Sequence, residues 1–131
     1  MQHVSPLDAS DSERLDAQRT WVGGHLADDS RKSFSDVATK LAVIQAVLDN
    51  GWATAEQTWH LQALGVVFGD ILAELLSVPW VVVEDEYGRD PALLLREGPV
   101  LAFPLTMISK RVEAGETVDV TDLLVRTAQA V

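Results

Sequence analysis

The sequence predicts an α+β fold with three N-terminal helices including a long central one, a small three-stranded antiparallel sheet, and two short C-terminal helices. Three observations support this order. Apolar residues recur at helical spacing up to about residue 76. From Pro79 the pattern changes, because "WVVVEDE" is rich in the β-branched and aromatic residues that favour strands. Beyond Pro104 the helical spacing returns in two short segments.

The N-terminal part is predicted to begin with a loose arm over residues 1–9. Ser10 with Glu13 has the spacing of a capping box, so the first helix is expected to begin there. "ADDSRKS" then forms a polar connection. Ser33 or Ser35 is expected to cap the second helix.

The third helix is predicted to be the longest element. The second helix is expected to end at "NG", residues 50–51, since both residues tolerate a left-handed cap conformation. Thr54 with Gln57 has the spacing of another capping box and predicts the start of the third helix. This helix is apolar on most sides, which places it at the centre of the fold. Gly65 and Gly69 would allow a neighbouring element to approach it closely.

The predicted sheet is a meander of three strands. The first strand begins at Trp80, "YG" at residues 87–88 forms a tight turn, and residues 91–96 return antiparallel. "GP" at residues 98–99 breaks the chain before the third strand, "VLAF". Both faces of the first strand are apolar at its start and acidic at its end. We therefore expect this strand to leave a covered interior and emerge into water.

The two C-terminal helices are predicted from their end signals. Pro104 is suited to the first turn of a helix, and Gly115 is suited to the position just after its end. Asp119 or Thr121 is expected to cap the last helix, which extends to about Ala130.

The composition is that of an ordinary globular protein, with 47% hydrophobic and 23% charged residues. The length suits a single domain over residues 1–131. There are no cysteines, which excludes disulfides and thiolate chemistry. The N-terminus lacks a signal-peptide pattern, and Asp70 and Glu74 interrupt the longest apolar run. A cytoplasmic protein with no membrane association is therefore expected.

The net charge of −10 narrows the class of partner. Ten basic residues are scattered among twenty acidic ones, without the basic cluster that binding to nucleic acid requires. We therefore expect no nucleic-acid partner. An acidic field of this kind would speed the encounter with a basic protein. The alternative is that the charge serves solubility only.

Motifs of common enzymes and cofactor sites are missing from the sequence. It contains no G-x-S-x-G, and "GVVFGD" lacks the lysine and the spacing of a phosphate-binding loop. His3, His25 and His60 do not have the spacing of a metal site. The sequence therefore predicts no metal, no cofactor and no enzymatic activity.

The acidic turn after the first strand is the first candidate site. Glu84, Asp85, Glu86 and Asp90 lie at or near the turn, with Arg89 between them. They could form a surface for a basic partner, or offer oxygens to a hard cation, although the ligand order of a calcium loop is missing. The third possibility is a solvated hairpin end that Arg89 neutralises locally.

Asp70 in the long helix is the second candidate. It either lies on a wet strip that it shares with Glu74, or it is buried with a cationic partner. The cations expected to reach it are Arg89, Lys110 and Arg111. A paired carboxylate between helix and sheet could also be a catalytic acid, with these cations binding an anionic substrate.

Two aromatic residues are the expected anchors for a protein partner. Trp52 lies in the turn between two predicted helices, where exposure is expected, and Tyr87 lies in the acidic turn. Buried aromatic anchors supply much of the affinity of an interface, whereas charges mainly set the association rate.

Residues 61–124 resemble an uncharacterised family of small bacterial domains, a domain of unknown function. The resemblance rests on Gly69-Asp70, "WVVVEDEYGRDPAL" and "FPLTMISKRVE" taken jointly. It implies no established activity, so it carries over no catalytic residues. Proteins of this size and acidity without catalytic motifs are also similar, as a class, to the immunity proteins that bacteria keep against secreted toxins.

These observations favour a non-enzymatic protein-binding module, most concretely an immunity-type inhibitor of a toxin with a basic active cleft. The alternative is a small enzyme or anionic-ligand-binding domain that uses Asp70 with Arg89, Lys110 or Arg111 in a concave pocket between helix and sheet. A third possibility is a self-associating protein, that is, a homo-oligomer.

Overall fold

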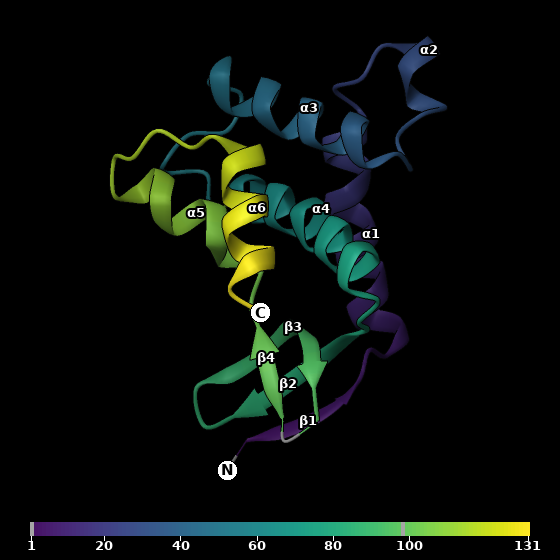
Figure 1. The fold of residues 1–131 in the computed structure, drawn as a ribbon, viewed down its shortest axis with the longest axis vertical. Helices are drawn as coiled ribbons and strands as arrows, with labels where there is room; N and C mark the ends of the chain where they lie inside the picture. Colours follow the sequence, from purple (N-terminus) through teal and green to yellow (C-terminus); the bar gives the residue numbers. More distant parts are fainter. Residues whose placement is uncertain (1, 98) are drawn as a thin grey trace.

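The computed structural model describes residues 2–97 and 99–131, and over these it shows six helices and one four-stranded antiparallel sheet (Figure 1). The elements are, in chain order, β1 (His3–Pro6), α1 (Ala9–Gly23), α2 (Asp28–Arg31), α3 (Val37–Asp49), α4 (Thr58–Leu76), β2 (Trp80–Asp85), β3 (Gly88–Arg96), β4 (Val100–Ala102), α5 (Leu105–Glu113) and α6 (Val120–Gln129). The α+β class predicted from the sequence is confirmed. The sheet has the order β1-β2-β3-β4 and lies at one end of the molecule, beyond the helices (Figure 1).

The prediction of a loose N-terminal arm is wrong, because part of it forms the fourth strand of the sheet. Strand β1 pairs antiparallel with β2, with Val4 opposite Val83 and Pro6 opposite Val81. A strand of four residues that ends in proline has little local signal. It is held by backbone pairing with β2 and by Val4, which packs against the buried cluster of Val81, Val83 and Ala92.

The N-terminal helices also begin at other residues than predicted. A capping box opens α1, but it is made by Asp8 and Asp11 rather than by Ser10 and Glu13. The polar connection contains the single-turn helix α2. Helix α3 follows Asp36 rather than either predicted serine, and it ends at the predicted place, with Gly51 in the left-handed region at φ +67°.

Helix α4 is the core of the fold, as its apolar pattern predicted. By length and composition alone it could cross a membrane. Here it is packed by α1, α3 and α5, and Leu61, Leu64 and Phe68 are fully buried. The capping box predicted for Thr54 and Gln57 forms only in part: the Thr54 N–H donates to Gln57 Oε1, but the Gln57 N–H donates to the Thr54 backbone carbonyl, and α4 begins only at Thr58.

The close approach expected at the two glycines of α4 is confirmed. A Cβ placed on Gly65 would lie 2.6 Å from Leu105 Cα and from the Pro104 carbonyl oxygen. A Cβ on Gly69 would lie 2.5 Å from the ring of Trp80. These two positions let α5 and the first residue of β2 pack directly on the backbone of α4.

The sheet separates a large core from a small one. Trp80 and Leu93, opposite each other in β2 and β3, pack against the main core around α4. On the other face Val81, Val83 and Ala92 form a second buried cluster. Burial ends between Val83 and the exposed Glu84, which confirms that β2 emerges from the interior into water.

The C-terminal helices are close to those predicted. Pro104 is the N-cap of α5 rather than part of its first turn, and Gly115 follows this helix with φ +80°. Asp119 caps α6, because its Oδ1 accepts a hydrogen bond of 3.0 Å from the Asp122 N–H. Of the predicted break at residues 98–99, Gly98 lies outside the described residues.

Candidate functional site

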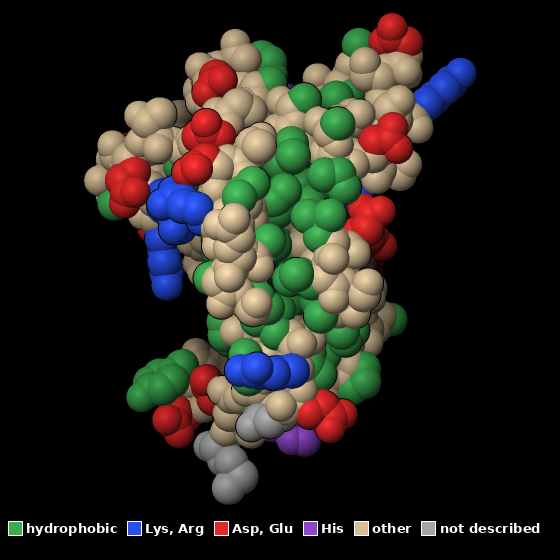
Figure 2. Space-filling view, viewed as in Figure 1, with side chains coloured by type: hydrophobic (Ala, Val, Ile, Leu, Met, Phe, Trp, Pro, Cys, Tyr) green, Lys and Arg blue, Asp and Glu red, His purple; other side chains and the backbone are tan. Residues whose placement is uncertain are grey.

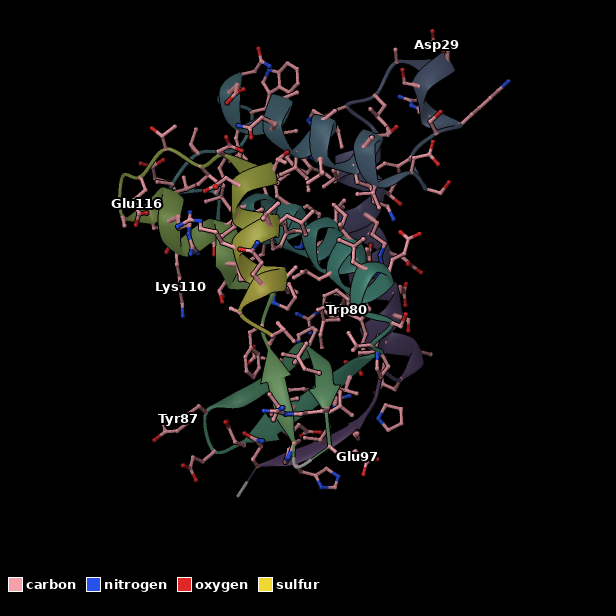
Figure 3. The ribbon with its side chains drawn as sticks, viewed as in Figure 1. Asp29, Trp80, Tyr87, Glu97, Lys110 and Glu116 are labelled. Carbon is pink, nitrogen blue, oxygen red and sulfur yellow. The ribbon has the colours of Figure 1, made fainter. Side chains whose placement is uncertain are left out.

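The turn between β2 and β3 carries the most exposed large side chain of the acidic segment. Asp85 pairs with Gly88, so the loop consists of Glu86 and Tyr87. The Tyr87 N–H donates a 2.8 Å hydrogen bond to Asp85 Oδ1, and Gly88 adopts φ +138°, which a side chain would disfavour. Tyr87 is 89% exposed and points away from the body of the protein (Figure 3).

Asp85, Glu86 and Tyr87, which we call the hairpin tip, are all exposed, and so is Asp90. Asp85 has a structural role within the tip, because its Oδ1 accepts the hydrogen bond from the Tyr87 N–H that stabilises the turn. Asp90 lies opposite Val83, two residue pairs further into the hairpin. The structure therefore brings acidic groups and one aromatic side chain together on an exposed projection.

Arg89 does more than neutralise the turn, because it ties the hairpin to the start of α1. It bonds Glu84, its partner across β2 and β3. Its Nη2 also lies 2.5 Å from Asp11 Oδ2 and 3.3 Å from Asp8 Oδ2. Arg89 and Glu84 are therefore mainly structural, and the hairpin tip lies beyond them. Sequence reasoning missed Asp8 and Asp11, whose D-x-x-D spacing is also that of a capping box.

The bond from Arg89 lowers the pKa of the buried Asp11 carboxyl below its ordinary value of 3.8, against the opposing effect of burial. The same contact raises the pKa of Arg89. Two N–H donors and a neighbouring positive charge favour the ionised carboxylate. The junction of hairpin and helix therefore depends on the charge of Asp11.

We expect the stabilisation from Asp11 to disappear in acid. Because its pKa is lower in the folded state than in the unfolded one, the stabilisation is complete above about pH 4 and is lost as the pH falls through the folded pKa. Urea unfolding of wild type and Asp11→Asn should therefore differ most at neutral pH and converge below about pH 4. Asp29→Asn, at an exposed acid of α2, is the control. A difference that does not change with pH would contradict this role.

Asp70 is paired, but with none of the cations expected from the sequence. Arg19 of α1 holds it in a two-bond contact, Nε to Oδ2 at 2.7 Å and Nη2 to Oδ1 at 2.8 Å. Trp80 Nε1 donates to the same carboxylate at 3.0 Å. The hydrogen bonds that Arg19 donates to Asp70 also raise the pKa of Arg19. Asp70 thus joins α1, α4 and β2, and it does not line the cavity between helix and sheet that Lys110 borders.

The other two cations expected to reach Asp70 lie in different surroundings. Arg111 Nη1 donates to the Met107 carbonyl on its own helix. Lys110 is exposed and lines a cavity between helix and sheet together with Arg89 and Asp90. Within residues 2–97 and 99–131, no group of three His, Cys, Asp or Glu residues is arranged to hold a metal ion.

Trp52 is 48% exposed, as expected, but it lies in the helical part of the protein, between α3 and α4. Its ring stacks on His25 at 5.4 Å. His25 in turn packs edge-on against Trp21, which also contacts Trp59. Helix α3 lies at the end of the molecule away from the sheet (Figure 1). The structure therefore does not bring Trp52 and Tyr87 into one surface.

Comparisons with known proteins identify a family and a fold. A family model described as "Domain of unknown function (DUF3806)" matches residues 40–123. A comparison with curated proteins gives no significant match. A crystal structure of a protein from Bacteroides thetaiotaomicron VPI-5482 is similar, with a TM-score of 0.76 and 16% sequence identity. The similarity covers 99% of this chain and 48% of that protein, so this chain spans about half its length.

Proposed function

Because this chain belongs to the family described as a domain of unknown function (DUF3806), and that description assigns no reaction, we propose from its geometry that the protein is a non-enzymatic protein-binding module. The family membership agrees with the resemblance predicted for residues 61–124. The observation that carries the proposal is the hairpin tip, where a tyrosine with 89% of its surface exposed stands beside exposed carboxylates. Exposed aromatic residues are enriched at binding interfaces, because one end is apolar and the other is polar.

The charge of the protein indicates the chemistry of the partner. The net charge of −10 attracts a basic surface from a distance, and the tip places part of that charge where contact can occur. In such a complex the carboxylates would set the association rate and Tyr87 would supply affinity by burial in the partner. Trp52, the other aromatic anchor expected from the sequence, is exposed at the other end of the molecule and lies outside this interface.

The most concrete form of this function is immunity: a cytoplasmic protein that masks the basic active cleft of a secreted toxin. Support comes from acidity, small size and an exposed acidic projection, and from the class-level similarity to immunity proteins. The pairing of Asp70 with Arg19 and Trp80 favours this proposal over the enzymatic alternative, which relied on Asp70 as its acid. Mass measurements at two concentrations test the third alternative, a homo-oligomer.

The proposal is tested by capturing the partner from the native cell with protein tagged at its C-terminus, and then comparing two variants of equal charge change. The hairpin variant is Asp85→Asn, Glu86→Lys and Asp90→Lys, in which asparagine keeps the oxygen that holds the turn. The control variant is Asp29→Asn, Glu56→Lys and Glu116→Lys, at exposed acids outside the hairpin.

We expect one basic partner whose association rate falls roughly tenfold or more in the hairpin variant, because electrostatic steering depends on charge at the contact. The control variant should bind nearly as wild type does. Tyr87→Ala should leave the association rate unchanged and raise the dissociation rate, by roughly thirtyfold if it is a main anchor. An equal effect of both triple variants would mean unspecific attraction, and no effect of either would exclude the hairpin tip as the interface.

A further inference from the structure

A cavity of about 310 Å³ lies between the helical part and the sheet, next to α5. We call it the α5 cavity. It is lined by residues of α1, α4, β3 and α5 and by Phe103, just before α5. Figure 2 shows the outline of the molecule narrowing on this side, below the Lys and Arg side chains of α5. Lys110 extends from α5 toward the level of the sheet (Figure 3). The volume is at the lower end of the range of about 300–1,000 Å³ for small-molecule sites.

The charge around the α5 cavity is opposite to that of the whole protein. Three of the ten basic residues line it, Arg14, Arg89 and Lys110, against one acid, Asp90. Arg89 is already compensated by carboxylates of α1 and β2. Arg14 and Lys110 are exposed, and among the described residues neither has an ion-pair partner. Two uncompensated cations from different helices thus border one hollow in an acidic protein.

The remaining wall supplies apolar surface and the start of a helix. Phe103 is 40% exposed, and Pro91 and Leu105 line the cavity beside it. Leu105 and Thr106 are the first residues of α5, and the Thr106 N–H already donates to the Phe103 carbonyl oxygen, so this end contributes through the helix dipole rather than through that N–H. The positive end of the helix dipole adds to the two side-chain charges.

We propose that the α5 cavity binds a small organic anion, whose phosphate or carboxylate group lies between Arg14 and Lys110 and whose apolar part lies on Phe103. Asp90 on the cavity wall repels anions, and it favours a ligand that presents a hydroxyl or amino group to it. This site uses other residues than the hairpin tip, and it shares only Asp90 with the variant that tests the protein-binding function.

Phenyl phosphate is the probe for the test, because it joins an anionic group to an apolar ring. We would titrate it into the ¹⁵N-labelled protein and follow backbone amide shifts, with inorganic phosphate, 3-phenylpropionate and benzyl alcohol as comparisons. Saturable shifts should centre on Phe103, Thr106 and Lys110. At least one of phenyl phosphate and 3-phenylpropionate should bind more tightly than both inorganic phosphate and benzyl alcohol. The tighter of these two aromatic anions shows whether the site prefers a phosphate or a carboxylate.

The double variant Arg14→Ala with Lys110→Ala should weaken the binding of phenyl phosphate at least about tenfold, because each substitution removes a charged contact. Lys32→Ala with Arg126→Ala, which removes the same charge at exposed positions outside the cavity, should bind as wild type does. Asp90→Asn should bind anions more tightly. Shifts that do not saturate, that are spread over the basic residues, or that persist unchanged in the Arg14 and Lys110 variant would overturn the proposal.

Discussion

Gly65→Ala is expected to lower the free energy of unfolding by about 2–3 kcal/mol, as overpacking against a rigid neighbour does. The added Cβ would lie 2.6 Å from Leu105 Cα and 2.7 Å from the Leu105 carbonyl oxygen. These are backbone atoms, so α5 has to move as a whole. At an exposed position in a helix, Gly→Ala would raise the free energy of unfolding by up to about 1 kcal/mol. The sign of the measured change therefore tests the close packing at Gly65.

Gly23→Ala is the matched control for this prediction. Gly23 is also helical, but the atoms nearest to its added Cβ belong to the Phe34 ring, at 3.1 Å. A side chain can turn away, so we expect a change within about 1 kcal/mol. Both variants are measured by urea unfolding. Equal effects at Gly23 and Gly65 would mean that α5 is not held against the backbone of α4.

Asp70→Ala is expected to destabilise the protein by about 2–3 kcal/mol, somewhat less than the 3–5 kcal/mol found when one partner of a fully buried ion pair is removed. The side chains of Arg19 and Asp70 retain 28% and 18% exposure, which reduces the penalty. The change leaves the guanidinium without its two-bond partner and the Trp80 N–H without its acceptor.

The control for Asp70 is Glu74→Ala, one turn further along α4, where the acid is exposed and the expected change is within about 0.5 kcal/mol. A double-mutant cycle with Arg19→Ala isolates the contribution of the pair. Unchanged stability in Asp70→Ala would contradict a joining role and would return this carboxylate to consideration as a functional acid.

The parts of the fold that were predicted correctly have local patterns. The apolar residues of α4, the β-branched run of β2, and the glycines that follow α3 and α5 each lie within one short segment. Strand β1 could not be found in this way, because its partner lies about 80 residues further along the chain. The first helix was misplaced because "DASD" and "SDSE" both have the spacing of a capping box, and only the contact with Arg89 favours the former.

The candidate site likewise has features that the sequence predicted and features that it did not. The exposure of Tyr87 and Trp52 followed from their positions in turns. The pairing of Asp70 with Arg19 did not, because the two residues are 51 positions apart and their contact depends on how α1 packs on α4. The α5 cavity draws Arg14 and Lys110 from helices at opposite ends of the sequence, so no spacing in the chain could have indicated it.

The pairing of β1 with β2 has a consequence for the order in which the chain folds. During synthesis the ribosome releases Val4 long before Val83, its partner in the sheet. Closing so long a loop has an entropic cost, and contacts between distant segments form slowly. The helices can assemble around α4 and the β2–β3 hairpin can close locally first, so we expect the pairing of β1 with β2 to be completed last.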